Sequence, residues 1–155
     1  MLKSIEGNFD HPEVNELLKK HFIELRSASP EGSAHVLDIP GLKISSIKFW
    51  SLWKSGKLLG CGALKFLEKG HGEFKSIRVH DDYRNQGNGL KVIEHLIEEA
   101  KKLNIKRLSI ETGAGKFFKP ARKLFKKCKF EPCEPFAHYK KDINSIYLTK
   151  LINNN

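Results

Sequence analysis

The chain has 155 residues, with 28 Lys and Arg against 18 Asp and Glu and a net charge of +10 at pH 7. This length predicts a single domain over residues 1–155, and the charge suits an anionic ligand or a nucleic-acid or membrane surface. Three cysteines without C-x-x-C spacing argue against a disulfide framework or a zinc site. Because no signal peptide or apolar run of membrane length occurs, we expect a cytoplasmic protein without a membrane partner.

The first part of the chain predicts a strand, a helix and a long loop. Residues 2–9 suit a short strand, and apolar residues at three- and four-residue steps predict a helix over residues 12–26. His21 lies on the apolar face of that helix and is interpreted as a structural histidine, because no second polar residue accompanies it. Residues 27–46 have no clear period, and loops of this length tend to be functional or mobile.

A β-hairpin is predicted next. Ile47–Lys54 and Lys57–Leu67 read as strands, and Ser55-Gly56 reads as the turn that joins them. Trp50 and Trp53 are an odd number of residues apart, so they should face opposite sides of the sheet.

The most informative stretch is a strand, a turn with two glycines and a helix. Residues 73–79 read as the strand, and apolar residues from Leu90 to Leu103 recur with helical spacing. A glycine-bearing turn that opens a helix predicts an anion site, because free backbone N–H groups and the positive helix end point into one hollow. We therefore expect a phosphorylated ligand here.

The spacing of this turn excludes two common nucleotide motifs. The dinucleotide fingerprint needs a third glycine where the chain has Val92, and the Gly-Lys-Ser or Gly-Lys-Thr of a P-loop does not occur. The pattern that remains is Arg84-x-x-Gly87-x-Gly89.

The last part of the chain predicts a strand parallel to the previous one, a helix and two further strands. The corresponding residues are 106–111, 117–128, 130–134 and 145–151, and residues 153–155 should be frayed. Lysines cover the outer face of the helix, whereas its phenylalanines lie on the apolar face. Nucleic-acid binding is therefore not expected, since it would require exposed aromatics among the basic residues.

Arg84-x-x-Gly87-x-Gly89, together with a later Ala121-x-x-Leu124-Phe125, resembles the pyrophosphate signature of the GNAT N-acetyltransferase superfamily. Within it the chain is most similar to a bacterial group named for indole-acetic-acid acetyltransferases, in segments such as 60–65 and 111–113. The resemblance implies acetyl-CoA as co-substrate. A metal is not expected, because His71, His80 and His138 share no ligand spacing. The implied fold is α/β (α+β), a mixed, mostly antiparallel twisted sheet with helices on both faces and a splayed central pair of parallel strands.

The resemblance also implies site residues. Those expected to bind the coenzyme are Ile77, Val79, Arg84, Asn85, Gln86, Gly87, Asn88 and Gly89. Glu73 matches the glutamate that serves as general base in histone-type members, although a solvated carboxylate at the start of a strand is a competing interpretation. Glu111 is the reserve candidate. Phe125 replaces the tyrosine that protonates the thiolate in many members, so Tyr139 or water would have to serve as the acid.

The implied function is transfer of the acetyl group of acetyl-CoA directly to a primary amine, which we expect to belong to a small molecule. His35, Glu111, Phe136, His138 and Asn144 are the candidate acceptor-binding residues. Two alternatives stay open: acetylation of a protein lysine or N-terminus, and a non-catalytic module that senses acyl-CoA. Dimers are common in the family, so a homodimer is compatible with the resemblance.

Overall fold

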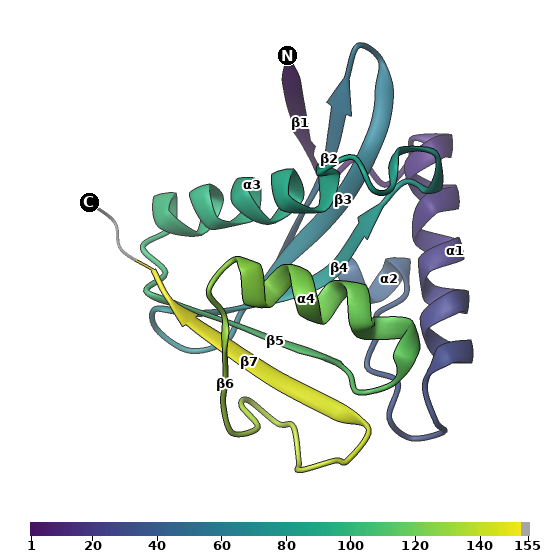
Figure 1. Ribbon diagram of the computed structural model, residues 1–155. Helices are drawn as coiled ribbons and strands as arrows, with labels where there is room; N and C mark the ends of the chain where they lie inside the picture. Colours follow the sequence, from purple (N-terminus) through teal and green to yellow (C-terminus); the bar gives the residue numbers. More distant parts are fainter. Residues whose placement is uncertain (153–155) are drawn as a thin grey trace.

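The computed structural model describes residues 1–152, so the expected fraying at 153–155 lies outside it. Seven strands form one sheet in the order β1-β2-β3-β4-β5-β7-β6, and all neighbours are antiparallel except β4 and β5 (Figure 1). The strands are β1 (Leu2–Glu6), β2 (Ile47–Lys54), β3 (Lys57–Phe66), β4 (His71–Val79), β5 (Arg107–Gly113), β6 (Glu131–Pro132) and β7 (Ser145–Leu151).

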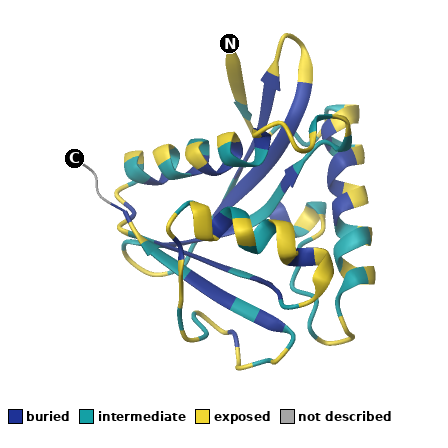
Figure 2. Cartoon of the chain, viewed as in Figure 1, coloured by how far each residue is buried: buried dark blue, intermediate teal, exposed yellow. Residues whose placement is uncertain are grey.

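Four α-helices and two short 3₁₀ helices cover the sheet. They are α1 (Pro12–Ala28), α2 (Ile39–Leu42), η1 (Asp81–Tyr83), α3 (Asn88–Lys102), η2 (Lys116–Phe118) and α4 (Lys119–Lys127). Helices α1 and α2 pack on one face of the sheet, and α3 and α4 contribute to the core on the other. The longer helices α1, α3 and α4 each bury one side and expose the opposite one, as amphipathic spacing requires (Figure 2).

The two tryptophans of the hairpin confirm the predicted alternation. Trp50 lies in the core beneath α3, whereas Trp53 packs with residues of α1 on the other face. The hairpin strands themselves agree with the prediction to within one residue.

The parallel pair β4 and β5 separates along its length. Backbone pairing joins only His71–Glu73 of β4 to Arg107–Ser109 of β5. Beyond Glu73, β4 stays paired with β3, and β5 stays paired with β7 up to Gly113. The splayed arrangement expected for this sheet is therefore confirmed, and it opens a gap between the C-terminal halves of the two strands.

Three predicted boundaries were wrong. The first strand ends at Glu6 rather than at residue 9, because Gly7 takes a left-handed conformation with φ of 70°. The helix expected from residue 117 begins as the 3₁₀ turn η2 and becomes α-helical only at Lys119, where Pro120 occupies the first turn. The strand expected over residues 130–134 has only two residues, Glu131 and Pro132, on the edge of the sheet.

Candidate active site

A cavity of about 630 Å³ occupies the gap between β4 and β5. Its walls are the second half of β4, the end of β5, the turn before α3, and parts of α1, α4 and the loop over residues 33–37. Segments far apart between residues 21 and 127 therefore meet at one cavity.

One end of the cavity is the turn that opens α3. Gly87 is the N-cap in a left-handed conformation with φ of 80°, and no side chain caps the helix. The first N–H groups of α3 are thus free for a ligand, and the helix dipole favours an anion there. Asn85 is also left-handed, with φ of 61°, and Asn88 fixes the turn by donating from Nδ2 to the Tyr83 carbonyl at 2.9 Å. A Cβ atom on Gly89 would lie 2.7 Å from Leu124 Cδ2, so glycine allows α3 and α4 to approach closely.

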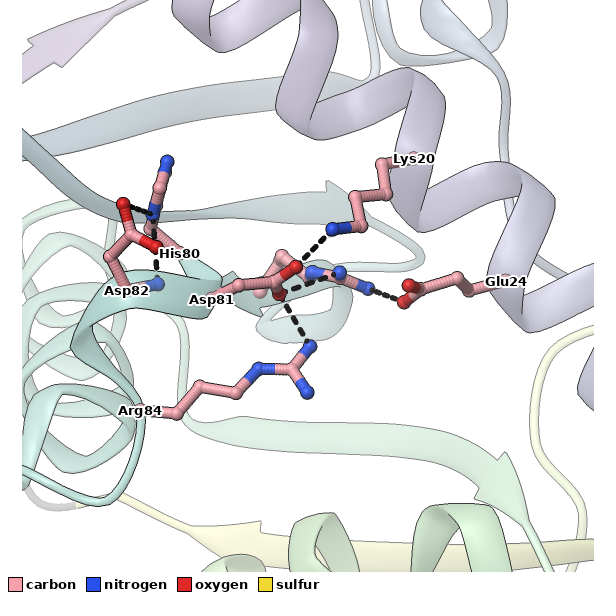
Figure 3. Close-up of polar contacts among 7 residues, drawn as sticks. Lys20, Glu24, His80, Asp81, Asp82 and Arg84 are labelled. Carbon is pink, nitrogen blue, oxygen red and sulfur yellow. Dashed lines mark hydrogen bonds and ion pairs between the residues drawn. The ribbon is translucent and has the colours of Figure 1, made fainter.

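An ion-pair network ties this turn to α1 (Figure 3). Asp81 of η1 accepts hydrogen bonds from Lys20 of α1 and from Arg78 Nη2 at 3.1 Å, and it pairs with Arg84 Nη2 at 3.0 Å. Arg78 also donates from Nη1 to Glu24 Oε2 at 2.5 Å. The hydrogen bond from Lys20 lowers the pKa of Asp81, and the one from Arg78 lowers the pKa of Glu24, so both carboxylates stay ionised near neutral pH.

A bulge in β4 shapes the middle of the cavity. The register with β3 shifts between Cys61 and Ala63, and Ser76 adopts a left-handed conformation with φ of 52°. A bulge leaves the backbone of its extra residue outside the ladder and turns it to one side. Ile77 and Val79, both expected to bind the coenzyme, follow this bulge and line the cavity.

Glu73 lies in a buried polar cluster below the cavity. It is 1% exposed, so the solvated carboxylate considered as an alternative was wrong. Its Oε2 accepts a hydrogen bond from Tyr139 Oη at 2.5 Å and one from Lys75 Nζ at 3.4 Å, while Oε1 is buried without a partner among residues 1–152. Lys75 also donates to Tyr139 Oη at 2.9 Å and to the His35 carbonyl at 3.2 Å. Burial, followed by the nearby Glu73 charge, raises the pKa of Tyr139.

Glu111, near the end of β5, is the carboxylate that lines the cavity. Ser145 donates to its Oε2 at 2.8 Å. Burial raises the pKa of Glu111, and the hydrogen bond from Ser145 opposes that rise. Raised basicity and contact with the cavity are the properties of a carboxylate that can accept a proton from a bound ligand.

The cavity brings together most, but not all, of the residues that the sequence predicted. Nine of them line it: His35, Ile77, Val79, Arg84, Asn85, Gly87, Asn88, Gly89 and Glu111. The lining does not include Gln86, Glu73, Tyr139, Phe136, His138 or Asn144.

All of the predicted residues outside the lining except Gln86, which is exposed in the turn, form a supporting layer. Phe136 and His138 pack against the Tyr139 ring, at centroid distances of 5.2 Å and 4.8 Å. Asn144 accepts a hydrogen bond from the Ala114 amide at 2.9 Å, and its Nδ2 lies 3.4 Å from Ser33 Oγ. These contacts join the loop after β6 to the cluster around Glu73 and to the loop over the cavity.

Sequence reasoning missed several lining residues, notably Lys75 and Arg78. In a regular strand Lys75 shares a face with Ile77 and Val79, so the period of β4 could have identified it. Arg78 could have been identified only if the bulge at Ser76 had been anticipated, and serine gives no sign of a left-handed residue. His21, interpreted as a structural histidine, also lines the cavity. Within residues 1–152, no group of three or more His, Cys, Asp or Glu could hold a metal ion.

Comparisons with known proteins agree with this geometry. Residues 12–130 match the family model of the acetyltransferase (GNAT) family. The Bacillus subtilis (strain 168) protein named uncharacterized N-acetyltransferase YsnE is 44% identical over 138 residues, which are 89% of this chain and 91% of that protein. The Azospirillum brasilense IAA acetyltransferase is 32% identical over 122 residues, 78% of each chain. The predicted relation to the group named for indole-acetic-acid acetyltransferases is therefore confirmed.

The fold recurs in solved structures. A Bacillus subtilis acetyltransferase in complex with CoA superposes with a TM-score of 0.73 at 19% identity, over 99% of this chain and all of that one. No helix of residues 1–152 is long and apolar enough to cross a membrane. From the family model, the relatives and the fold together, the chain belongs to the acetyltransferase (GNAT) family and is an acyl-CoA-dependent acyltransferase.

Proposed function

We propose that this protein transfers the acetyl group of acetyl-CoA directly to the primary amine of a small molecule. The observation that carries the proposal is the polarity of the cavity. One end offers free N–H groups at the start of α3 and the side chain of Arg84, and the wall formed by β5 holds the carboxylate of Glu111. A polyanionic donor and a cationic acceptor would each meet complementary charge.

The donor would bind with its pyrophosphate at the turn over residues 84–89 and its pantetheine arm along β4. Gly87 supplies the left-handed conformation, and the absence of a side chain at Gly89 keeps α3 close to α4. The backbone after the bulge at Ser76 faces the cavity, and its hydrogen-bond ladder with β3 is incomplete there. An N–H group fixed at this point would stabilise the negative charge that develops on the acetyl oxygen.

The acceptor amine must lose a proton to react. An alkyl amine of pKa about 10.4 is neutral in only about one molecule in a few thousand at pH 7, so a base raises the rate. We propose Glu111 as the group that takes this proton, because it lines the cavity while Glu73 is sealed beneath it. Glu73, which the resemblance implied as the base, would instead act through an intervening water or hold Lys75 and Tyr139 in place.

In the proposed reaction, the amine nitrogen forms a bond to the thioester carbon and the C–S bond breaks. Phe125 lines the cavity at the position of the family's tyrosine and has no proton to donate. A thiol of pKa about 8.5 is a tolerable leaving group without an acid, and water or the protonated base can return a proton to the thiolate. The hydroxyl of Tyr139 donates to Glu73, so this geometry favours a positioning role over that of the acid.

The test combines binding and turnover. Excess acetyl-CoA should raise the midpoint of thermal unfolding, whereas ATP should not, and a panel of small primary amines should then yield free thiol. Glu111→Gln should lower kcat by about 10²-fold or more with unchanged coenzyme affinity, and Glu73→Gln is the matched carboxylate control. If millimolar acetyl-CoA does not shift the unfolding midpoint, the proposal is refuted. If turnover occurs only with a peptide lysine or N-terminus, the acceptor is a protein and not a small molecule.

The pH dependence follows from the raised pKa of Glu111. The base must be ionised, so the wild-type rate should fall as the pH drops through that pKa, and this acid limb should be lost in Glu111→Gln. An acid limb that persists in Glu111→Gln and disappears in Glu73→Gln would assign the base to Glu73.

The cytoplasmic location and the homodimer stay predictions.

A further inference from the structure

His21 is a buried polar side chain that the proposed reaction does not use. It is 5% exposed, and its Nδ1 has no hydrogen-bond partner among residues 1–152. His21 and Leu25 are four residues apart on α1, and both line the cavity together with Ser29, the C-cap of the helix. An unsatisfied buried nitrogen costs free energy, so such groups usually have a partner that completes them.

The contacts of its neighbours place His21 at the phosphate end of the cavity. Lys20 and Glu24 flank it on α1 and bind Asp81 and Arg78, which lie on either side of the strand end that leads to the turn (Figure 3). Arg78 and Arg84 are both close enough to lower the pKa of His21. The histidine therefore shares its surroundings with the turn that opens α3.

The net charge of the groups around His21 favours an anion. The charged groups that act on the pKa of His21 are Glu24 of α1, Arg78 of β4 and Arg84 of the turn, and Lys20 of α1 and Asp81 of η1 complete the ion-pair network to which they belong. Three of these are cations and two are carboxylates, so one positive charge is in excess while the ring is neutral. Burial first, and then the arginines, lower the pKa of His21 to about 4, so the ring is uncharged at neutral pH without a ligand.

We propose that His21 is a further acyl-CoA-binding residue, whose imidazole N–H donates a hydrogen bond to the pyrophosphate held at the N-terminus of α3. This inference rests on the proposed function. A pyrophosphate beside the ring would favour the imidazolium form, so the protein takes up a proton when the donor binds. Affinity for the donor consequently rises as the pH falls from 8 to 6.

The experiment measures the dissociation constant of 3′-dephospho-CoA by calorimetry at pH 6 and pH 8. This probe keeps the pyrophosphate and lacks the phosphate monoester that would itself titrate near pH 6. If the ligand restores the ordinary histidine pKa of about 6.5, wild-type binding should be about fourfold tighter at pH 6 than at pH 8. His21→Leu should bind more weakly at both pH values and lose this fourfold gain.

Two further variants test whether His21 is the group that titrates. His21→Gln keeps a side-chain N–H donor without a titrating group, so it should retain most of the affinity at pH 8 but show no gain at pH 6. His95→Leu is the matched control, because His95 is a half-buried histidine on α3 that contacts Trp50 outside the cavity, and burial lowers its pKa too. It should behave as wild type.

Failure of this inference can be distinguished from failure of the proposed function. If wild type binds the probe and both His21 variants keep its affinity and its pH dependence, His21 does not contact the pyrophosphate and the inference is overturned. If His95→Leu abolishes the pH dependence instead, the titrating group is misassigned. If folded wild type binds no coenzyme at all, the proposed function itself falls.

Discussion

Replacing Tyr139 with phenylalanine tests the buried cluster around Glu73. The Tyr139 hydroxyl donates to Glu73 Oε2 at 2.5 Å, and Glu73 is 1% exposed, so the change removes the shortest bond to a buried carboxylate. Glu73 would then keep only Lys75, at 3.4 Å. A hydrogen bond to a charged group contributes about 1.5–3 kcal/mol, which corresponds to a fall of roughly 4–10 °C in the unfolding midpoint for a domain of this size.

Tyr147→Phe is the matched control for this measurement. Tyr147 is buried to a similar extent, and its hydroxyl donates to the neutral Lys140 carbonyl at 2.7 Å. Its loss should cost about 1 kcal/mol. Urea unfolding of both variants gives the two free energies, and equal losses would refute the stronger stabilisation expected from the hydrogen bond between Tyr139 and Glu73.

The same variant separates two roles for Tyr139. If its hydroxyl only positions Glu73 and Lys75, kcat of Tyr139→Phe should stay within about tenfold of wild type, with a pH profile of the same shape. If it protonates the thiolate, kcat should fall by about 10²-fold or more, as for loss of a general acid. The larger fall would overturn the positioning role.

Three further predictions follow from the cavity and its walls. Gly87→Ala should lower the free energy of unfolding by about 1–2 kcal/mol, because φ is 80° there. Gly115→Ala is the control, since Gly115 has φ of −71° and open space around its Cβ, and it should change the free energy of unfolding little. Equal losses for the two variants in denaturant titrations would contradict the prediction. Lowering the pH from 7 to 5 should destabilise wild type by about 2 kcal/mol more than His21→Leu. The unfolded chain takes up a proton at His21, whereas the buried ring, with a pKa of about 4, does not. If urea unfolding gives the same change of stability with pH for both proteins, that linkage is excluded. Arg84→Ala should raise the KM for acetyl-CoA about tenfold with kcat nearly unchanged, and steady-state kinetics showing a fall in kcat alone would argue against a role in donor binding.

Local spacing was enough to predict much of the fold. The hairpin, the strand before the turn, the helix after it and the last strand were located within a few residues, because amphipathic period and turn residues act over short distances. The turn over residues 84–89 was predicted as an anion site for the same reason. Its glycines and the helix that follows them are adjacent in the chain, so their geometry is set locally.

Tertiary structure decided what surrounds that turn. Glu73, Lys75 and Tyr139 meet although up to 66 positions separate them, and no local pattern shows that Tyr139 turns toward Glu73 rather than the cavity. The burial of Glu73 and the exposure of Glu111 to the cavity depend on where β4 and β5 part. The sequence was sufficient to predict the family, the sheet and the geometry of the turn before α3. Which carboxylate lines the cavity was decided only by packing between distant segments, because burial depends on neighbours that lie far apart along the chain.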